Sequence, residues 1–501
     1  MEKIKKLFKT KASKNIIFSL LNQVVTIVVG LIVPRLIIKT YGSETNGLIN
    51  SITQFLGYIT LLDLGFGPVV KSTLYGPLKK KDKKQIANII TAAGRFFRRI
   101  SYVFIGYIIF LCVFMNTAVA SDLGWWETAS LVLIISLSTF FEYFIGLAYS
   151  LFIEADKRNY VLSLVKIATS ILNAVITVVL IRCGSSIQIV KLMASMVYIV
   201  RPIFYYLYVH RKYDLNLKDA DPNFEIKEKS VALAQHISGI IHGKTDTLLL
   251  SLFVNQIMVS VYSVYYLVMN ALQSLVSNIA NSLAGHFGQM IASEDVRTLR
   301  KTFGIYEVIF SFIITVVFGV TFALIVPFVE LYTQGITDAD YVQPVFAAII
   351  TVAFYLHSLK CPYNSLVNAA GLFRDNRKGS IIEAALNLGI SLVLIFPLGI
   401  KGVAIGTLIS VLYRYIVIVR LSSKKVLKRK NAEHRKVALV SGLSILILIF
   451  LYRLIGINIS TYSDFAMVGI LYVLIGAIVA GLIYGAFYSG KIKKLIKERK
   501  K

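Results

Sequence analysis

An apolar stretch in the middle of the chain carries side chains that could bind charged groups. Residues 236–250 read HISGIIHGKTDTLLL and hold His236, His242, Lys244 and Asp246. An ammonium or a protonated imidazole binds phosphate and other anions, whereas a carboxylate binds a proton or a metal cation. The stretch therefore offers groups for an anion and for a cation, and the surrounding element decides whether they can be used.

A transmembrane helix over 230–253 would bury these groups deeply. Residue 242 would lie roughly 18 Å from the start of the helix, at about 1.5 Å per residue. A charge facing lipid at that depth costs at least about 2.5–3.5 kcal/mol, so we expect the side chains to face a water-filled cavity or one another. Asp246 shares one helical face with Gly239 and Gly243. The alternative is a polar helix contact built on this pair of small residues.

Neutral polar side chains recur along two other apolar runs. They are Asn22, Gln23 and Thr26 in the first run, and Tyr262, Tyr266, Asn270, Gln273, Ser277 and Asn281 in a later one. The later set is spaced by three and four residues and forms one stripe along a helix. Such a stripe suits a sugar, which needs hydrogen-bonding groups and flat apolar surfaces. A hydrogen-bonded seam between two helices explains the stripe equally well.

Further charged residues lie inside predicted spans. The cations Arg201, Arg414 and Lys360 lie in inner halves of spans and Arg35 lies near an outer end. They are candidates for binding phosphate, and snorkelling to lipid headgroups is the alternative. The acidic residues are candidates for pairing with these cations or for binding a coupling ion, H⁺ or Na⁺. These candidates are Asp63, Glu142 and Asp246.

The composition identifies the elements that must position these groups. The chain has 501 residues, 56% of them hydrophobic and only 16% charged, with a mean hydropathy of +0.71. These values are too apolar for soluble domains of this length and indicate a polytopic membrane protein. The net charge is +28, but the basic residues collect between apolar runs, so we expect contact with anionic membrane lipids or a topology signal, and no nucleic acid partner.

Runs of about 20 apolar residues predict fourteen transmembrane helices. Their positions are near 15–38, 47–70, 97–115, 128–152, 160–181, 187–209, 230–253, 258–283, 303–327, 341–366, 379–396, 402–421, 437–455 and 466–488. Most Lys and Arg outside these runs fall in alternate connections, whereas the other connections hold only Lys39, Arg182 and Lys401. The positive-inside rule then predicts a multi-pass membrane protein with cytoplasmic N- and C-termini.

An internal repeat divides the chain. ILNAVITVVLI at 171–181 aligns with ALNLGISLVLI at 385–395, an offset of 214 residues that also superposes spans 1–6 on spans 7–12. Halves with an even number of spans share their topology and form a parallel repeat. We expect these regions: an N-terminal lobe 1–209, a cytoplasmic linker 210–229, a C-terminal lobe 230–422, a basic linker 423–436, and two extra helices with a basic tail at 437–501.

Signatures of catalysis are missing from the sequence. Cys112, Cys183 and Cys361 have no metal or disulfide spacing, and the chain has no metal-ligand cluster, phosphate-binding glycine loop or nucleotide-binding domain. We therefore expect no enzyme activity, no metal and no cofactor other than a coupling ion. Two lobes that can rock about a shared site favour a transporter.

Two segments resemble a known family. The segment 32–75, IVPRLIIKTYGSETNGLINSITQFLGYITLLDLGFGPVVKSTLY, is similar to the N-terminal signature of Wzx-type polysaccharide flippases in the multidrug/oligosaccharidyl-lipid/polysaccharide (MOP) exporter superfamily. The segment 362–410 resembles the second half of these proteins, with a turn at 368–371 and a glycine-rich entry to the next span at 399–404. The resemblance covers spans 1–12 and the fourteen-span layout.

The resemblance implies an all-α, MOP/MATE-like fold with two six-helix lobes around a cationic cavity, plus two extra C-terminal helices. It implies translocation of an undecaprenyl-pyrophosphate-linked oligosaccharide, which is a precursor of surface polysaccharide. The substrate would move from the inner to the outer leaflet by alternating access. Glycan assembly proteins would be further partners. A teichoic-acid precursor or lipid II flippase is a close alternative. A MATE-like cation/drug antiporter is another, although it would favour acidic over basic residues in the lumen.

Overall fold

The computed structural model is helical throughout the part that it describes. It describes residues 10–63, 65–119, 121, 123–213, 215–217, 220–226, 244–293, 295–430, 432–457 and 459–499. The first half contains α2 (Lys11–Leu56), η1 (Gly57–Leu61), α3 (Phe66–Lys80), α4 (Lys83–Ala118), α5 (Trp125–Phe141), η2 (Glu142–Gly146), α6 (Leu147–Ala155), α7 (Asn159–Arg182) and α8 (Ile187–Tyr213). The second half contains α10 (Gln256–Ser282), α11 (Ala284–Ala292), α12 (Val296–Tyr332), α13 (Pro344–Ala369), α14 (Phe373–Leu398), α15 (Ile400–Leu421), η5 (Ser422–Val426), α16 (Ala432–Ile455) and α17 (Tyr462–Arg499).

Twelve helices of the described chain are long and apolar enough to cross a membrane. One of them, Ser13–Leu61, contains the first predicted span and part of the second. The seventh predicted span, 230–253, lies mostly outside the described residues, which contain only its helical end at 244–253. The structure thus agrees with the all-α polytopic fold and with the predicted layout of spans.

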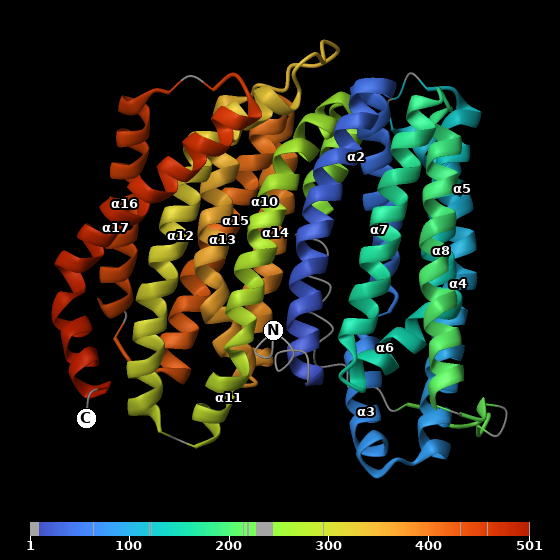
Figure 1. Ribbon diagram of the computed structural model, residues 1–501, viewed down its shortest axis with the longest axis horizontal. Coiled ribbons are helices and arrows are strands. Elements are labelled where there is room, and N and C mark those ends of the chain that lie inside the picture. The colour runs from blue at the N-terminus through green and yellow to red at the C-terminus, as the bar shows by residue number, and fades with distance from the viewer. Residues whose placement is uncertain are drawn as a thin grey trace, which may run out of the picture. The chain divides into compact units, whose positions relative to one another are not determined.

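The chain forms two compact units (Figure 1). The first comprises Met1–Ile240 together with Ser251–Ser260, and the second comprises Ile241–Leu250 and Val261–Lys501. Residues 251–260 pack on α2 within the first unit, where Ser51 donates a 2.6 Å hydrogen bond to the Gln256 Oε1 atom and Asn46 donates one of 2.8 Å to Ser260. This exchange of short segments was not predicted, because hydropathy carries no information on contacts between distant residues.

In the first unit α2 contains two helical segments that meet at Gly42. This residue has φ 88° and ψ 165°, a conformation that only glycine adopts readily. The first segment runs alongside α7, with Asn15 bonded to the Lys157 carbonyl (3.0 Å) near one end and Tyr41 bonded to the Ser185 carbonyl (2.6 Å) near the other. Gly42 therefore provides the connection between the first and second predicted spans.

The second predicted span is interrupted. We expected a continuous helix over 47–70, but α2 ends at Leu56, a short 3₁₀ segment follows, and α3 starts only at Phe66. Gly65 has φ 73°, and its backbone N–H donates a 3.0 Å hydrogen bond to the Asp63 side chain. The glycines and the aspartate favour this break, which an apolar run does not reveal because its hydropathy hardly changes there.

The fourth span also departs from a regular helix. The π-helical turn η2 joins α5 to α6 and contains Glu142. At its end Gly146 packs against α8 so closely that an added Cβ would lie 2.6 Å from the Pro202 Cβ atom. Turns of this kind are rare and often lie at functional sites, and this one gives Glu142 a local geometry that regular helical spacing does not predict.

In the second unit close helix contacts depend on small residues. On α15, an added Cβ at Gly402 would lie 2.1 Å from the Leu394 carbonyl oxygen, and one at Gly406 would lie 2.1 Å from the Ser391 Oγ atom. Both partners belong to α14. The glycine-rich entry to this span therefore allows two helices to approach at backbone distance.

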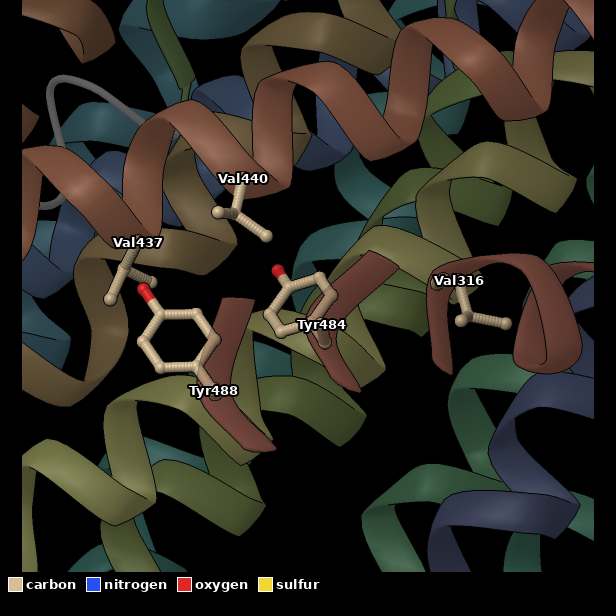
Figure 2. Close-up of a cluster of buried hydrophobic side chains, with 6 residues drawn as sticks. Val316, Val437, Val440, Tyr484 and Tyr488 are labelled. Atoms are coloured by element: carbon tan, nitrogen blue, oxygen red, sulfur yellow. The ribbon is translucent and has the colours of Figure 1, made fainter. Parts of the chain in front are cut away.

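The two C-terminal helices belong to the second unit. Val437 and Val440 of α16 face Tyr484 and Tyr488 of α17, and Val316 of α12 completes this buried cluster (Figure 2). The Ser441 hydroxyl lies 2.6 Å from the Tyr484 hydroxyl inside it, so the buried tyrosine oxygen is hydrogen-bonded. This packing fixes α16 and α17 against α12.

Candidate functional site

Asp246 lies in a buried polar network formed by four helical segments of the second unit. Its side chain is only 6% exposed. The Oδ2 atom accepts hydrogen bonds from the Thr407 hydroxyl of α15 (2.8 Å) and the Tyr262 hydroxyl of α10 (3.0 Å). Asn387 of α14 lies 3.5 Å from the Oδ1 atom and donates a 3.0 Å bond to the Thr407 oxygen. One intramembrane carboxylate is thus held by three neutral partners.

This network is rich in oxygen atoms that could bind a cation. The Asn387 Oδ1 atom is buried and has no hydrogen-bond partner among the described residues, so it adds an acceptor beside the Asp246 carboxylate. Among the described residues no group of three or more His, Cys, Asp or Glu could hold a metal ion. One carboxylate with neutral amide and hydroxyl oxygens suits a proton or a hard monovalent cation better than a transition metal.

The predicted polar stripe on α10 has two kinds of members. Three of them bond to α13: Gln273 lies 2.5 Å from the His357 ring, Ser277 lies 3.8 Å from the Cys361 sulfur, and Asn281 accepts a 2.9 Å bond from Ser365. These three residues therefore form a hydrogen-bonded seam between two helices, which was one of the two interpretations of the stripe. Tyr266 stacks on Tyr262 with ring centroids 5.5 Å apart, while Asn270 is exposed on the surface of the unit and remains a candidate for contact with a sugar.

Lys360 and Arg414 converge on one acidic residue, Glu383 of α14. The Lys360 Nζ atom lies 2.5 Å from one carboxylate oxygen, and the Arg414 Nε atom lies 3.2 Å from the other. All three side chains are buried. Arg414 also donates to Asn376 at 2.6 Å, and its Nη1 atom has no partner in the described part of the chain. Two cations therefore share a single carboxylate.

A comparable arrangement exists in the first unit. Arg201 of α8 donates to the hydroxyls of Thr169 (2.7 Å) and Ser170 (3.1 Å) on α7, and its guanidinium lies 4.3 Å from the Tyr198 ring centroid. Since the hydroxyls are neutral, their bonds leave the positive charge of Arg201 in place.

The two arrangements follow the internal repeat. Thr169, which holds Arg201, is 214 positions before Glu383, which holds Arg414. The repeated asparagines Asn173 and Asn387 are also equivalent, because each is buried and donates to a hydroxyl on the next helix, Tyr198 at 2.9 Å and Thr407 at 3.0 Å. The repeat thus extends from the sequence to hydrogen-bonded positions.

The structure also shows the local surroundings of the remaining predicted residues that it describes. Asn22 is partly buried on α2, and its Oδ1 atom has no partner among the described residues. Arg35 is partly buried on the same helix, Lys244 is partly buried at the start of the helical segment 244–253, and Asp63 lies at the break before α3. His242 lies outside the described residues.

Sequence reasoning missed Glu383 and a second buried cluster. Glu307 of α12 accepts from Arg429 at 2.7 Å and lies 3.0 Å from the ring of His434, and Tyr363 also bonds to it. The available signal was the presence of acidic residues inside apolar runs, namely Glu383 in 379–396 and Glu307 in 303–327. Their partners lie on other spans, so hydropathy alone could not pair them.

Comparison with solved structures identifies the fold. Over 95% of this chain and 100% of the other, it is similar to the lipid II flippase MurJ in an inward closed conformation, with a TM-score of 0.66 and 14% identity. It is also similar to an inward-facing multidrug resistance MATE family transporter of the MOP superfamily, with a TM-score of 0.61 and 15% identity over 80% of this chain and 96% of that one. The chain has the fold of MOP superfamily transporters.

A third structure shares this MOP fold, a MOP superfamily transporter from Pyrococcus furiosus. Its TM-score is 0.52, with 13% identity over 85% of this chain and 98% of that one. No family model matches the sequence, and a search of curated proteins finds no match. At these identities the likeness establishes the fold, and the residues must carry any argument about substrate.

Proposed function

We propose that the protein is a flippase that moves a lipid-linked, phosphate-bearing oligosaccharide from the inner to the outer leaflet of a bacterial plasma membrane by alternating access. The substrate class is an undecaprenyl-pyrophosphate-linked repeat unit, a precursor of surface polysaccharide. The MOP fold supports transport, and the intramembrane charges support an anionic substrate.

The observation that carries this proposal is the sharing of one carboxylate by two buried cations in the second unit. Lys360 and Arg414 share Glu383, and in the first unit Arg201 donates hydrogen bonds to two neutral hydroxyls of α7. Two cations around one carboxylate leave a net positive charge in a medium where unpaired charge is costly. An anionic headgroup relieves that cost as it binds, whereas a cationic drug increases it. The balance therefore favours the flippase over the cation/drug antiporter.

Ion coupling is proposed at Asp246. A carboxylate surrounded by Thr407, Tyr262 and Asn387 can bind H⁺ or Na⁺ and changes charge when it does so. Because Asn387 and Thr407 lie on α14 and α15, the occupancy of the site would alter how these helices pack against the segment 244–253. This is the kind of local change that can bias a transporter between its conformations.

Teichoic-acid precursors and lipid II present the same chemistry as the proposed substrate. Each is an undecaprenyl-linked phosphate or pyrophosphate with a polar head, and the described residues favour none of the three. Anionic membrane lipids and glycan assembly proteins are proposed as further partners.

Reconstitution tests the proposal. Purified protein in proteoliposomes receives a fluorescent undecaprenyl-pyrophosphate-linked glycan, and its appearance in the opposite leaflet is measured with H⁺, Na⁺ or no gradient. A parallel arm measures uptake of a cationic dye. We expect glycan flipping that depends on one ion gradient and no dye transport. Gradient-dependent dye transport without flipping would overturn the proposal in favour of the antiporter.

A charge series on Arg201 sharpens the test. Arg201→Gln keeps a hydrogen-bonding side chain but removes the charge, whereas Arg201→Lys keeps the charge. We expect the first to lower flipping by on the order of tenfold and the second to retain most of it. The matched control is Arg182→Gln, which removes a guanidinium at the exposed end of α7. Equal rates for Arg201→Gln and the control would remove Arg201 from substrate binding.

A further inference from the structure

A cavity lies in the first unit, among α4, the η2–α6 segment and α8. Its volume is ≈ 320 Å³, and its polar lining includes Thr91, Arg95 and Arg98 of α4. These three residues are spaced by four and three positions, so they lie on one helical face. The Thr91 Oγ1 atom is buried and has no hydrogen-bond partner among the described residues. Two guanidinium groups and an unsatisfied hydroxyl form a donor set that matches phosphate.

The depth of the cavity matches the membrane interface. α4 has 36 residues, or about 54 Å, which exceeds the roughly 30 Å hydrocarbon core of a bilayer. The predicted apolar span begins only at residue 97, beside Arg95 and Arg98. The start of the helix therefore extends out of the membrane on the side of the basic connections, and the two arginines lie at the level of the lipid headgroups.

The same face of α4 becomes apolar beyond the cavity. Tyr102, Ile105 and Ile109 continue its spacing and are 57%, 42% and 62% exposed. Beside them, Phe144 lies 6.1 Å from the Tyr102 ring centroid and stacks on Phe140 at 5.5 Å. A basic pocket at headgroup level that leads into an exposed apolar strip is complementary to one molecule with an anionic head and an acyl chain.

We propose that this face of α4 binds an anionic phospholipid of the inner leaflet, with the phosphate at Arg95, Arg98 and Thr91 and an acyl chain along Tyr102 and Ile105. Leu217 also lines the cavity, and Arg95 donates a 2.8 Å bond to the Phe224 carbonyl. Both residues belong to the connection between the two repeats. The bound lipid therefore stabilises the packing of this connection against α4. The site does not depend on the identity of the transported substrate.

Gly94 allows a steric test of the site. It lines the same cavity, and a Cβ added there meets nothing within 4 Å, so Gly94→Leu introduces a bulky side chain at the cavity without a clash at its Cβ atom. Arg98→Gln removes one charge from an exposed side chain. The control is the double variant Lys79→Gln/Lys80→Gln, which removes two exposed charges at the end of α3. Circular dichroism and gel filtration verify that each variant folds.

The measurement is native mass spectrometry of the full chain in neutral detergent, titrated with phosphatidylglycerol, phosphatidylcholine or inorganic phosphate. We expect Gly94→Leu and Arg98→Gln each to weaken the tightest phosphatidylglycerol binding by on the order of tenfold, and the control by less than about twofold. Phosphatidylcholine should bind the wild type on the order of tenfold more weakly. Unchanged affinity in both variants, or equal binding of the two lipids, would overturn the proposal. Saturation by inorganic phosphate alone would assign the cavity to a free anion instead.

Discussion

Glu383 is the residue on which the buried charges of the second unit depend. We predict that Glu383→Gln lowers the free energy of unfolding by about 3–5 kcal/mol, because it leaves Lys360 and Arg414 buried without a counter-charge. The matched control is Asp375→Asn, which breaks the exposed pair with Lys425 and should cost only about 0–1 kcal/mol. Thermal and denaturant unfolding in detergent measure both. Equal losses of unfolding free energy in the two variants would show that the buried group of Lys360, Arg414 and Glu383 stabilises the protein no more than an exposed ion pair does.

Asp246 makes a prediction about coupling rather than about folding. Asp246→Asn preserves the shape of the side chain and removes its charge, so the contacts with Thr407 and Tyr262 can largely persist. We expect flipping in proteoliposomes to lose its dependence on the H⁺ or Na⁺ gradient and to fall by on the order of tenfold or more. Asp340→Asn, in the connection before α13, is the control. A variant that still responds fully to the gradient would move the coupling site elsewhere.

At the scale of residues, sequence reasoning found the types of side chain but not their partners. Lys360 and Arg414 were predicted as phosphate ligands or snorkelling groups, and the structure pairs both with Glu383. Gln273 was predicted to contact a sugar or another helix, and it lies against His357. Pairings of this kind link spans far apart in the sequence, so spacing within one helix cannot reveal them.

The contact between α14 and α15 gives a prediction at the scale of elements. In Gly406→Ala the new Cβ would lie 2.1 Å from the Ser391 Oγ atom and 2.8 Å from its backbone nitrogen. We expect a loss of about 1–3 kcal/mol of stability. Gly389→Ala on α14 is the control, because its Cβ meets nothing within 4 Å, and it should be neutral or up to about 1 kcal/mol stabilising. Similar unfolding midpoints for the two variants would contradict this account of the helix contact.

The connection between α6 and α7 should be sensitive to acid. Burial alone would raise the pKa of Asp156, but hydrogen bonds from Tyr213 and Arg158 and the charge of Lys11 outweigh it and hold that pKa below 3.8. Because the pKa of Asp156 is lower in the folded than in the unfolded protein, its ionised form stabilises the fold. This stabilisation is complete above about pH 3.8, the unfolded pKa, and is lost as the pH falls through the pKa of the folded state.

Unfolding midpoints measured against pH test this prediction. Wild-type stability should fall more steeply below about pH 4 than that of Asp156→Asn, which lacks the carboxylate. Parallel curves for the two proteins would show that the contact of Asp156 with α2 and α8 does not contribute to stability.

Hydropathy predicted the elements better than their irregularities. The positions of the spans agree with the described helices, but the break at Asp63 and the π-helical turn at Glu142–Gly146 were not foreseen. Both occur inside runs that remain apolar, and each is set by backbone geometry and by tertiary contacts, as at Gly146 and Pro202. Amino-acid composition indicates which segments are buried in lipid, but it does not indicate where the helical backbone is interrupted.

At the scale of the whole molecule, the internal repeat carried the most information. The 214-residue offset predicted two related halves, and the structure places Asn173 and Asn387 in equivalent hydrogen bonds. The MOP fold was predicted correctly, and the domain boundaries, the cytoplasmic termini and the site residues stay predictions. The substrate could not be derived from the fold, because the solved structures that share this fold include both a flippase and a drug transporter.

The central claim is that positive charge inside the spans serves an anionic lipid-linked head. The most direct measurement compares flipping of two fluorescent substrates that carry the same glycan on the same polyprenyl chain, one through pyrophosphate and the other through a neutral linker, in proteoliposomes of the wild type. The pyrophosphate substrate should flip at least about tenfold faster. Equal rates, or faster movement of the neutral substrate, would contradict the account.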